Sequence, residues 1–138
     1  MREPNNKLDC VLLIDDDEAT NFYHTLILEE ECEWVHIQSV NSAKEGLDYL
    51  LGKGVYANSP QPGIVFLDIN MPGMDGWEFL EAYDELSKDI HDRVVVSILT
   101  TSFNPGDKDR AATIPSVKEF ANKPLTPEVF WSLVDKNF

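Results

Sequence analysis

Five side chains that could together transfer a phosphoryl group stand at the ends of apolar segments. Asp15 and Asp16 follow one such segment and Asp68 follows a second, while Thr100 and Lys123 stand at the ends of two more. Crowded carboxylates repel one another, so they favour a hard divalent cation such as Mg²⁺. A carboxylate nucleophile, Mg²⁺, a lysine and a hydroxyl are the groups needed to accept a phosphoryl group, because that reaction requires positioning and charge neutralisation. The pattern therefore indicates an aspartyl phosphate as the product.

The segments that carry these residues are predicted to be strands of one sheet. Apolar runs suited to buried strands cover residues 10–14, 64–67, 94–99 and 117–121, and residues 34–40 alternate well enough for a further strand. Loops at the carboxyl ends of parallel strands leave a crevice in which ligands bind. The five candidate side chains would therefore converge at one edge of the sheet.

A helix is predicted after each strand. The signals for helix starts are Asp17–Glu18, a capping box of Ser42 and Glu45, Gly76, Asn104–Pro105 and Thr126–Pro127. The apolar stripe that predicts the buried face of the first helix consists of Ala19, Phe22, Leu26 and Ile27. Strand and helix alternate five times, which predicts an α/β fold with a parallel sheet and helices on both faces.

The residues at the strand ends resemble those of the receiver domain of two-component response regulators. The resemblance runs from about residue 8 to the C-terminus and so covers nearly the whole chain. It implies a flavodoxin-like fold, in which five parallel strands form a doubly wound sheet of order 2-1-3-4-5. This fold agrees with the alternation of strands and helices.

The resemblance also implies a role for each residue of the site. Asp68 would be the phosphoacceptor, Thr100 would contact the phosphoryl group and Lys123 would pair with it. The groups implied to hold Mg²⁺ are the carboxylates of Asp15, Asp16 and Asp68 and the backbone carbonyl of Asn70.

The resemblance also concerns three further residues, Thr101, Phe120 and Pro124. Thr100 and Phe120 would form a switch, in which the threonine moves toward the phosphoryl group and the aromatic ring turns into the space it leaves. The peptide bond between Lys123 and Pro124 is usually cis in the family. Thr101 departs from the family pattern, since its position usually holds Ala, Ser or Gly.

Length and charge limit the classes of function. The 138 residues fit a single receiver domain, with residues 1–7 as a loose terminus and no room for an output domain. Eleven basic against 25 acidic residues give a formal net charge of −14, which disfavours direct binding of nucleic acid or anionic membranes. No apolar stretch approaches the length of a membrane span. We therefore expect a cytoplasmic, stand-alone response regulator.

The expected partners follow from the resemblance. A sensor histidine kinase or a histidine phosphotransfer protein would supply the phosphoryl group, and a downstream protein would read a phosphorylation-dependent surface. The chain would catalyse only its own phosphorylation and dephosphorylation, and would not be an enzyme acting on a separate substrate.

Three alternative interpretations fit these residues less well. An EF-hand loop starting at Asp68 fails, because Pro72 and Phe79 occupy positions that need oxygen ligands. A phosphohydrolase of the haloacid-dehalogenase type needs a second carboxylate two residues after the nucleophile, where this chain has Asn70. A degenerate receiver fold that binds a partner independently of phosphorylation is disfavoured, because no part of the site is missing.

Two other features carry no predicted role in the chemistry. His24, His36 and His91 show no metal-ligand pattern and are interpreted as ordinary surface or core residues. The Gly- and Pro-containing segment 52–63 is interpreted as a tolerated insertion in a loop.

Overall fold

Five parallel strands form the centre of the molecule, in the order β2-β1-β3-β4-β5. The computed structural model describes residues 7–138, so that only Lys7 of the expected loose terminus lies within the described residues. The strands are β1 (Cys10–Ile14), β2 (His36–Val40), β3 (Ile64–Leu67), β4 (Val95–Thr100) and β5 (Val117–Asn122). The predicted fold class and strand order are therefore confirmed.

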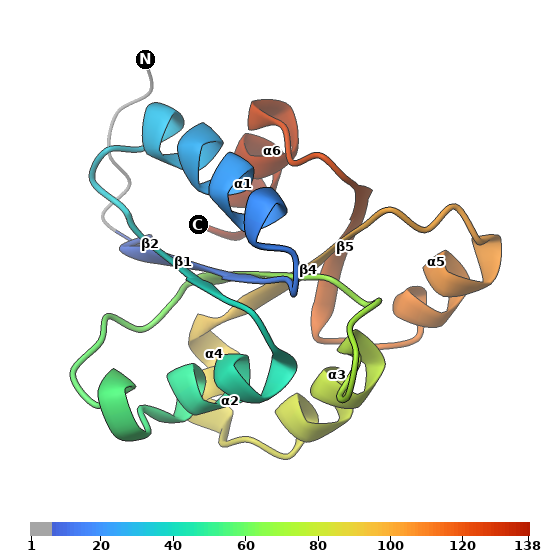
Figure 1. The fold of residues 1–138 in the computed structure, drawn as a ribbon, viewed down its shortest axis with the longest axis horizontal. Coiled ribbons are helices and arrows are strands. Elements are labelled where there is room, and N and C mark those ends of the chain that lie inside the picture. Colours follow the sequence, from blue (N-terminus) through green and yellow to red (C-terminus); the bar gives the residue numbers. More distant parts are fainter. Residues whose placement is uncertain (1–6) are drawn as a thin grey trace.

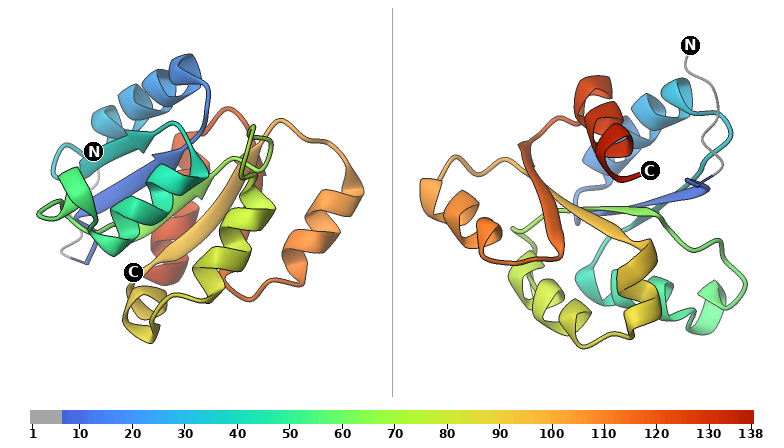
Figure 2. Two further views of the ribbon diagram at one scale, coloured as in Figure 1. Left: turned by 60° about the horizontal axis from the view of Figure 1, so that its bottom comes forward. Right: turned by 180° about the vertical axis from the view of Figure 1, so that it is seen from behind.

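Helices cover both faces of this sheet (Figure 1). They are α1 (Glu18–Glu31), α2 (Ala43–Leu51), α3 (Gly76–Asp84), α4 (Lys88–Arg93), α5 (Pro105–Ala112) and α6 (Pro127–Asn137), with a 3₁₀ turn at Gly54–Tyr56. Helices α1 and α6 lie on one face, and α2, α3 and α4 lie on the other, with α5 beside the β5 edge (Figures 1 and 2). None of the helices described between residues 7 and 138 is both long and apolar enough to cross a membrane.

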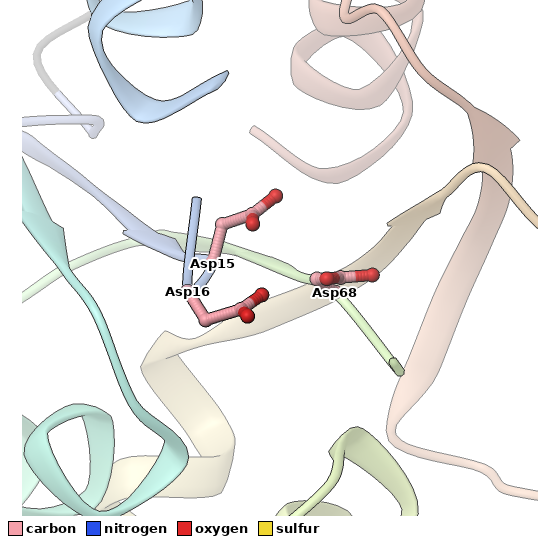
Figure 3. Close-up of side chains that lie close together, drawn as sticks. All are labelled: Asp15, Asp16 and Asp68. Carbon is pink, nitrogen blue, oxygen red and sulfur yellow. The ribbon is translucent and has the colours of Figure 1, made fainter. Parts of the chain in front are cut away.

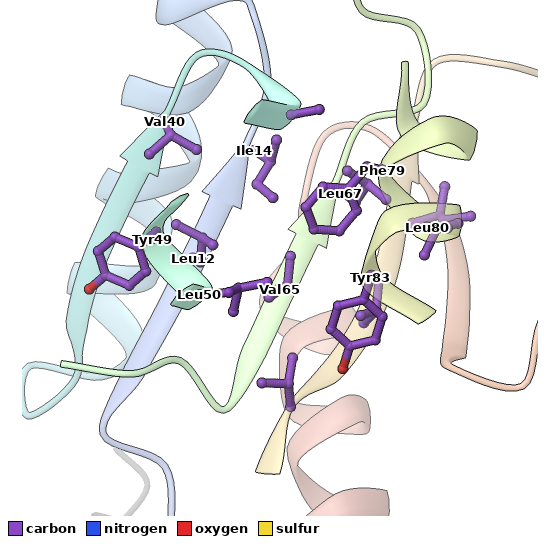
Figure 4. Close-up of a cluster of buried hydrophobic side chains, with 14 of the residues drawn as sticks. Leu12, Ile14, Val40, Tyr49, Leu50, Val65, Leu67, Phe79, Leu80 and Tyr83 are labelled. Atoms are coloured by element: carbon purple, nitrogen blue, oxygen red, sulfur yellow. The ribbon is translucent and has the colours of Figure 1, made fainter. Parts of the chain in front are cut away.

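The alternating side chains of the inner strands build two separate hydrophobic cores. In β1, Leu12 and Ile14 belong to the core under α2 and α3, whereas Val11 and Leu13 belong to the core under α1 and α6. Figure 4 shows the first of these cores, where the strand side chains face those of α2 and α3. Because both faces of the inner strands are buried, their sequences are continuously apolar rather than alternating.

The predicted helix starts are confirmed by capping hydrogen bonds. The side chains of Asp17, Ser42, Asn104 and Thr126 each accept a backbone N–H from the first turn of the helix that follows. Helix α4 was not predicted. It is a short, polar helix in which only Ile90 is buried, so that its sequence shows no apolar stripe.

The predicted buried face of α1 is wrong. Phe22 is 67% exposed and Leu26 is 49% exposed, while the buried residues of this helix are Asn21, His24 and Leu28. The helix is therefore rotated from the orientation that its apolar stripe predicts.

Polar contacts to neighbouring backbone explain this rotation. The side-chain amide of Asn21 donates to the carbonyl oxygens of Asp15, at 2.9 Å, and Val40, at 3.3 Å. The ring of His24 accepts the backbone N–H of Leu125 at 3.1 Å. Buried backbone groups need hydrogen-bond partners, and here a helix supplies them where the strands have ended.

Candidate functional site

Three carboxylates meet at the carboxyl ends of β1 and β3 (Figure 3). Ile14 and Leu67 are paired in register, so the residues that follow them, Asp15 and Asp68, are neighbours. One carboxylate oxygen from each of Asp15, Asp16 and Asp68 lies within 4.8 Å of the other two. Asp15 and Asp68 are buried and Asp16 is exposed, so that the cluster has one side open to solvent. Adjacent parallel strands therefore assemble the acidic cluster that the sequence predicts.

Local hydrogen bonds orient the two buried carboxylates. Asp15 Oδ1 accepts the backbone N–H of Asp17 at 2.9 Å, and Asp68 Oδ1 accepts that of Asn70 at 3.3 Å. In each residue the other oxygen, Oδ2, is the one that approaches Lys123. The turns after β1 and β3 thus fix which carboxylate oxygen meets the cation.

The loop after Asp68 is packed closely against the start of α3. A Cβ atom on Gly76 would lie 2.7 Å from the carbonyl oxygen of Asp68 and 2.6 Å from the Cα atom of Ile69. A glycine is required here because only its backbone can approach the loop this closely. The capping box of Asp75 and Glu78 then begins α3 at this point.

Lys123 brings a positive charge to the cluster from the end of β5. Its Nζ donates a hydrogen bond to Asp15 Oδ2 and lies 3.5 Å from Asp68 Oδ2. Its side chain is only 13% exposed. The peptide bond between Lys123 and Pro124 is cis, as the resemblance implied.

The carboxyl group of Asp68 has a raised pKa. Burial is the main cause, and the ammonium group of Lys123 opposes it by stabilising the ionised form. The nearby carboxylate of Asp15 acts in the same direction as burial. Three carboxylates and one ammonium leave an excess of negative charge, so the donor set fits a divalent cation.

The hydroxyl of Thr100, at the end of the strand next to β3, is engaged with its own loop. Thr100 is fully buried at the end of β4, and its Oγ1 accepts the backbone N–H of Ser102 at 3.2 Å. The side chain of Asn122 holds the same loop from β5 by donating to the carbonyl oxygen of Ser102 at 2.7 Å. Thr101 is exposed on this loop.

Phe120 lies on β5 away from the acidic cluster. It is half-buried and packs against the core under α2 and α3. Its ring lines an open hollow of about 240 Å³ between β5 and α5. The structure therefore gathers Asp15, Asp16, Asp68 and Lys123 at one point, and places Thr100 and Phe120 on the β4 and β5 side of it.

Two residues next to the site were not recognised from the sequence. Asn21 and His24 face inward from α1, and both line a small cavity that Asp15 and Asp68 also line. Together with Leu28 they follow a spacing of three and four residues, which is a helical face. The signal was present, but a polar face is normally expected to point toward solvent.

Comparison with known proteins points to the family that the sequence resembles. Residues 11–135 match the family described as the response regulator receiver domain. The response regulator Rcp1 of Synechocystis sp. is 29% identical over 107 residues, which are 78% of this chain and 71% of Rcp1.

Solved structures with the same fold include two response regulators. A two-component response regulator from Cytophaga hutchinsonii is 34% identical, with a TM-score of 0.84 over 95% of this chain and 97% of that chain. The Mn²⁺-bound form of Rcp1 has a TM-score of 0.73 at 24% identity, over 93% of this chain and 90% of that chain. The second likeness shows a shared fold.

Proposed function

Because this chain belongs to the response regulator receiver domain family, we propose that it accepts a phosphoryl group on Asp68 and signals through the surface that changes as a result. The observation that carries the proposal is the convergence of Asp15, Asp16, Asp68 and Lys123 at the carboxyl ends of three strands. The phosphoryl donor would be a sensor histidine kinase or a histidine phosphotransfer protein.

The metal that fits this site is Mg²⁺. The residues that would hold it are Asp15, Asp16, Asp68 and, through its backbone carbonyl, Asn70. The acidic cluster has the oxygen donors that such an ion prefers, and the relative Rcp1 has been crystallised in an Mn²⁺-bound form. When bound, the ion would neutralise negative charge on the phosphoryl oxygens.

The residues of the chain would perform the transfer itself. A carboxylate oxygen of Asp68 attacks the phosphorus of a phosphohistidine, the P–N bond breaks, and the imidazole leaves with the electron pair of that bond. Lys123 already touches both buried carboxylates, so its ammonium can pair with the incoming phosphoryl oxygens. Asn70 offers no second carboxylate to act on other substrates, and we infer that the chain catalyses only its own phosphorylation and hydrolysis.

The switch would connect this chemistry to a partner protein. Thr100 would exchange its hydrogen bond with the Ser102 N–H for one to a phosphoryl oxygen. The loop from Thr100 to Asn104 would move with it, and the ring of Phe120 would turn inward from its half-buried position. Helix α5 and strand β5 would then change their part of the surface that a downstream protein reads, while α6 borders that surface and stays in place.

Intact mass spectrometry tests the proposal. Incubation with acetyl phosphate and Mg²⁺ should add one phosphate to the parent protein, and none to Asp68→Asn or in the presence of EDTA. Asp9→Asn is the matched control, since Asp9 is exposed and outside the acidic cluster, and it should gain phosphate like the parent. A phosphate that still adds to Asp68→Asn would contradict the assignment.

A further inference from the structure

His24 makes a long-range hydrogen bond directly behind the acidic cluster. It is 3% exposed on the inner face of α1, and its Nε2 lies 3.1 Å from the backbone nitrogen of Leu125, which is 101 residues away in sequence. A neutral imidazole carries one proton, so an Nε2 that accepts a hydrogen bond places that proton on Nδ1. Burial, together with the charge of Lys123, lowers the pKa of His24 to about 4, in keeping with a neutral ring.

This bond holds the backbone beside Lys123. Leu125 follows Lys123 by two residues, and its own side chain is buried in the core under α1 and α6. On the other side, the backbone N–H of Lys123 donates to the carbonyl oxygen of Thr100 at 2.8 Å. The segment that presents Lys123 is thus anchored twice by hydrogen bonds, once to β4 and once to His24.

His24 lies next to the reacting groups and lines hollows on two sides of them, one with Asp15 and Asp68 and one with Lys123. With Asn21, Asp15 and Asp68 it lines a cavity of about 10 Å³, which is the size of one water molecule. The Oδ1 atom of Asn21 is buried and has no hydrogen-bond partner among residues 7–138. The inner face of α1 therefore supports the site from behind.

We propose that His24 is a positioning residue for the phosphorylation of Asp68, which holds the Leu125 amide and thereby fixes the Lys123 ammonium between Asp15 and Asp68. The inference rests on the proposed function and assigns a role to a residue outside the acidic cluster. His24 lies outside the acidic cluster and would contact neither the phosphoryl group nor the metal. It acts through Lys123.

Substitution of His24 tests this role. His24→Leu removes the acceptor and should slow phosphorylation by acetyl phosphate about tenfold, because displacing a positioned group by about 1 Å can cost up to ~100-fold in rate. His24→Gln keeps a side-chain oxygen at similar reach and should restore most of the rate. Equal rates for the parent and His24→Leu, or a His24→Gln variant as slow as His24→Leu, would overturn the proposal.

A double-mutant comparison separates positioning from a general structural effect. In a Lys123→Ala background, His24→Leu should cause no further loss of rate, since the group that it positions is gone. A tenfold loss that persists in this background would show that His24 acts by another route. If the parent itself gains no phosphate, the proposed function fails, and that result differs from all of these.

NMR of the parent protein tests the bond without any substitution. The imidazole nitrogens of a ¹⁵N-labelled sample should show a proton on Nδ1 of His24 and coupling between Nε2 and the Leu125 amide. A proton on Nε2 would contradict the proposal even if His24→Leu did not fold.

Discussion

The two flanks of the Asp68 site are held in different ways. On one flank, α1 and α6 pack over a core that includes Leu28, Phe130 and Leu133, and α1 adds buried polar contacts through Asn21 and His24. On the other flank, α5 buries only Ala111 and leaves an open hollow beside β5. Figures 1 and 2 show α5 at the β5 edge of the molecule, outside the two layers of helices that cover the sheet.

This difference would suit the two tasks of the proposed phosphorylation switch. The α1 and α6 flank lies against the strand ends that carry Asp15 and Lys123, where small displacements would slow the chemistry. The α5 flank follows the loop that begins at Thr100, where movement would be read by a partner. Few buried contacts give a segment a low local stability, so α5 is the element best able to move.

The largest expected effect on stability is in the core of the first flank. Phe130→Ala, at a fully buried position of α6, should lower the free energy of unfolding by about 3–5 kcal/mol. Ala111→Gly, at the only buried position of α5, should lower it by about 1 kcal/mol. Urea denaturation measures both, and equal losses would remove the distinction between the flanks.

Lowering the pH should destabilise the folded protein through His24, which lies on the same flank. The pKa of His24 falls from 6.5 to about 4 on folding, so the unfolded chain binds the proton first as the pH drops. Stability is therefore fully present above pH 6.5 and lost between pH 6.5 and about 4, by about 3 kcal/mol in total at about 1.36 kcal/mol per pKa unit.

Substitution isolates this contribution from those of other groups. Denaturation of His24→Gln across the same pH range should lack this part of the loss, while the exposed-site control His36→Gln should keep it. Identical pH profiles for the parent and His24→Gln would show that His24 does not remain neutral in the folded protein.

Metal binding should depend on Asp16, which follows β1, and not on Thr100 at the end of β4. Asp16→Asn removes a charge from the acidic cluster and should weaken Mg²⁺ binding about tenfold or more, equivalent to about 1.4 kcal/mol. Thr100→Val removes a hydroxyl that is bound to its own loop and should leave the affinity unchanged. Titration calorimetry measures both, and a loss of affinity in Thr100→Val alone would place the metal elsewhere.

The smallest effect is expected where α5 touches α3. The guanidinium of Arg110 lies 4.4 Å from the ring centre of Trp77, a contact typically worth about 0.5–1 kcal/mol at an exposed site. Arg110→Ala should therefore speed amide hydrogen exchange in α5 with little change in global stability. Lys108→Ala on the same helix is the control, and equal exchange in the two variants would mean that the Trp77 contact does not hold α5.

The sequence was sufficient to predict the elements of both flanks but not how they face one another. Apolar runs identified four of the strands and alternation identified β2, while capping residues such as Asn104 and Thr126 identified helix starts, because these signals are local. Helix α4 was missed because a helix with one buried residue leaves no periodic pattern.

The orientation of α1 was mispredicted for a tertiary reason. Phe22 and Leu26 form the apolar stripe, yet Asn21 and His24 are buried because backbone groups of distant loops need their hydrogen bonds. The prediction of the site was limited in the same way, because sequence patterns report only local structure. The acidic cluster follows from the strand ends, whereas the bond from His24 to Leu125 depends on a contact between residues far apart in the chain.

Hydrogen exchange with and without beryllofluoride, a mimic of the phosphoryl group, tests the central claim most directly. With Mg²⁺ present throughout, addition of beryllofluoride should change exchange in the loop after Thr100, in α5 and at the end of β5, and should leave α1 and α6 nearly unchanged. The Asp68→Asn variant should show no response. A response confined to α1 and α6, or one that persists in Asp68→Asn, would contradict the account.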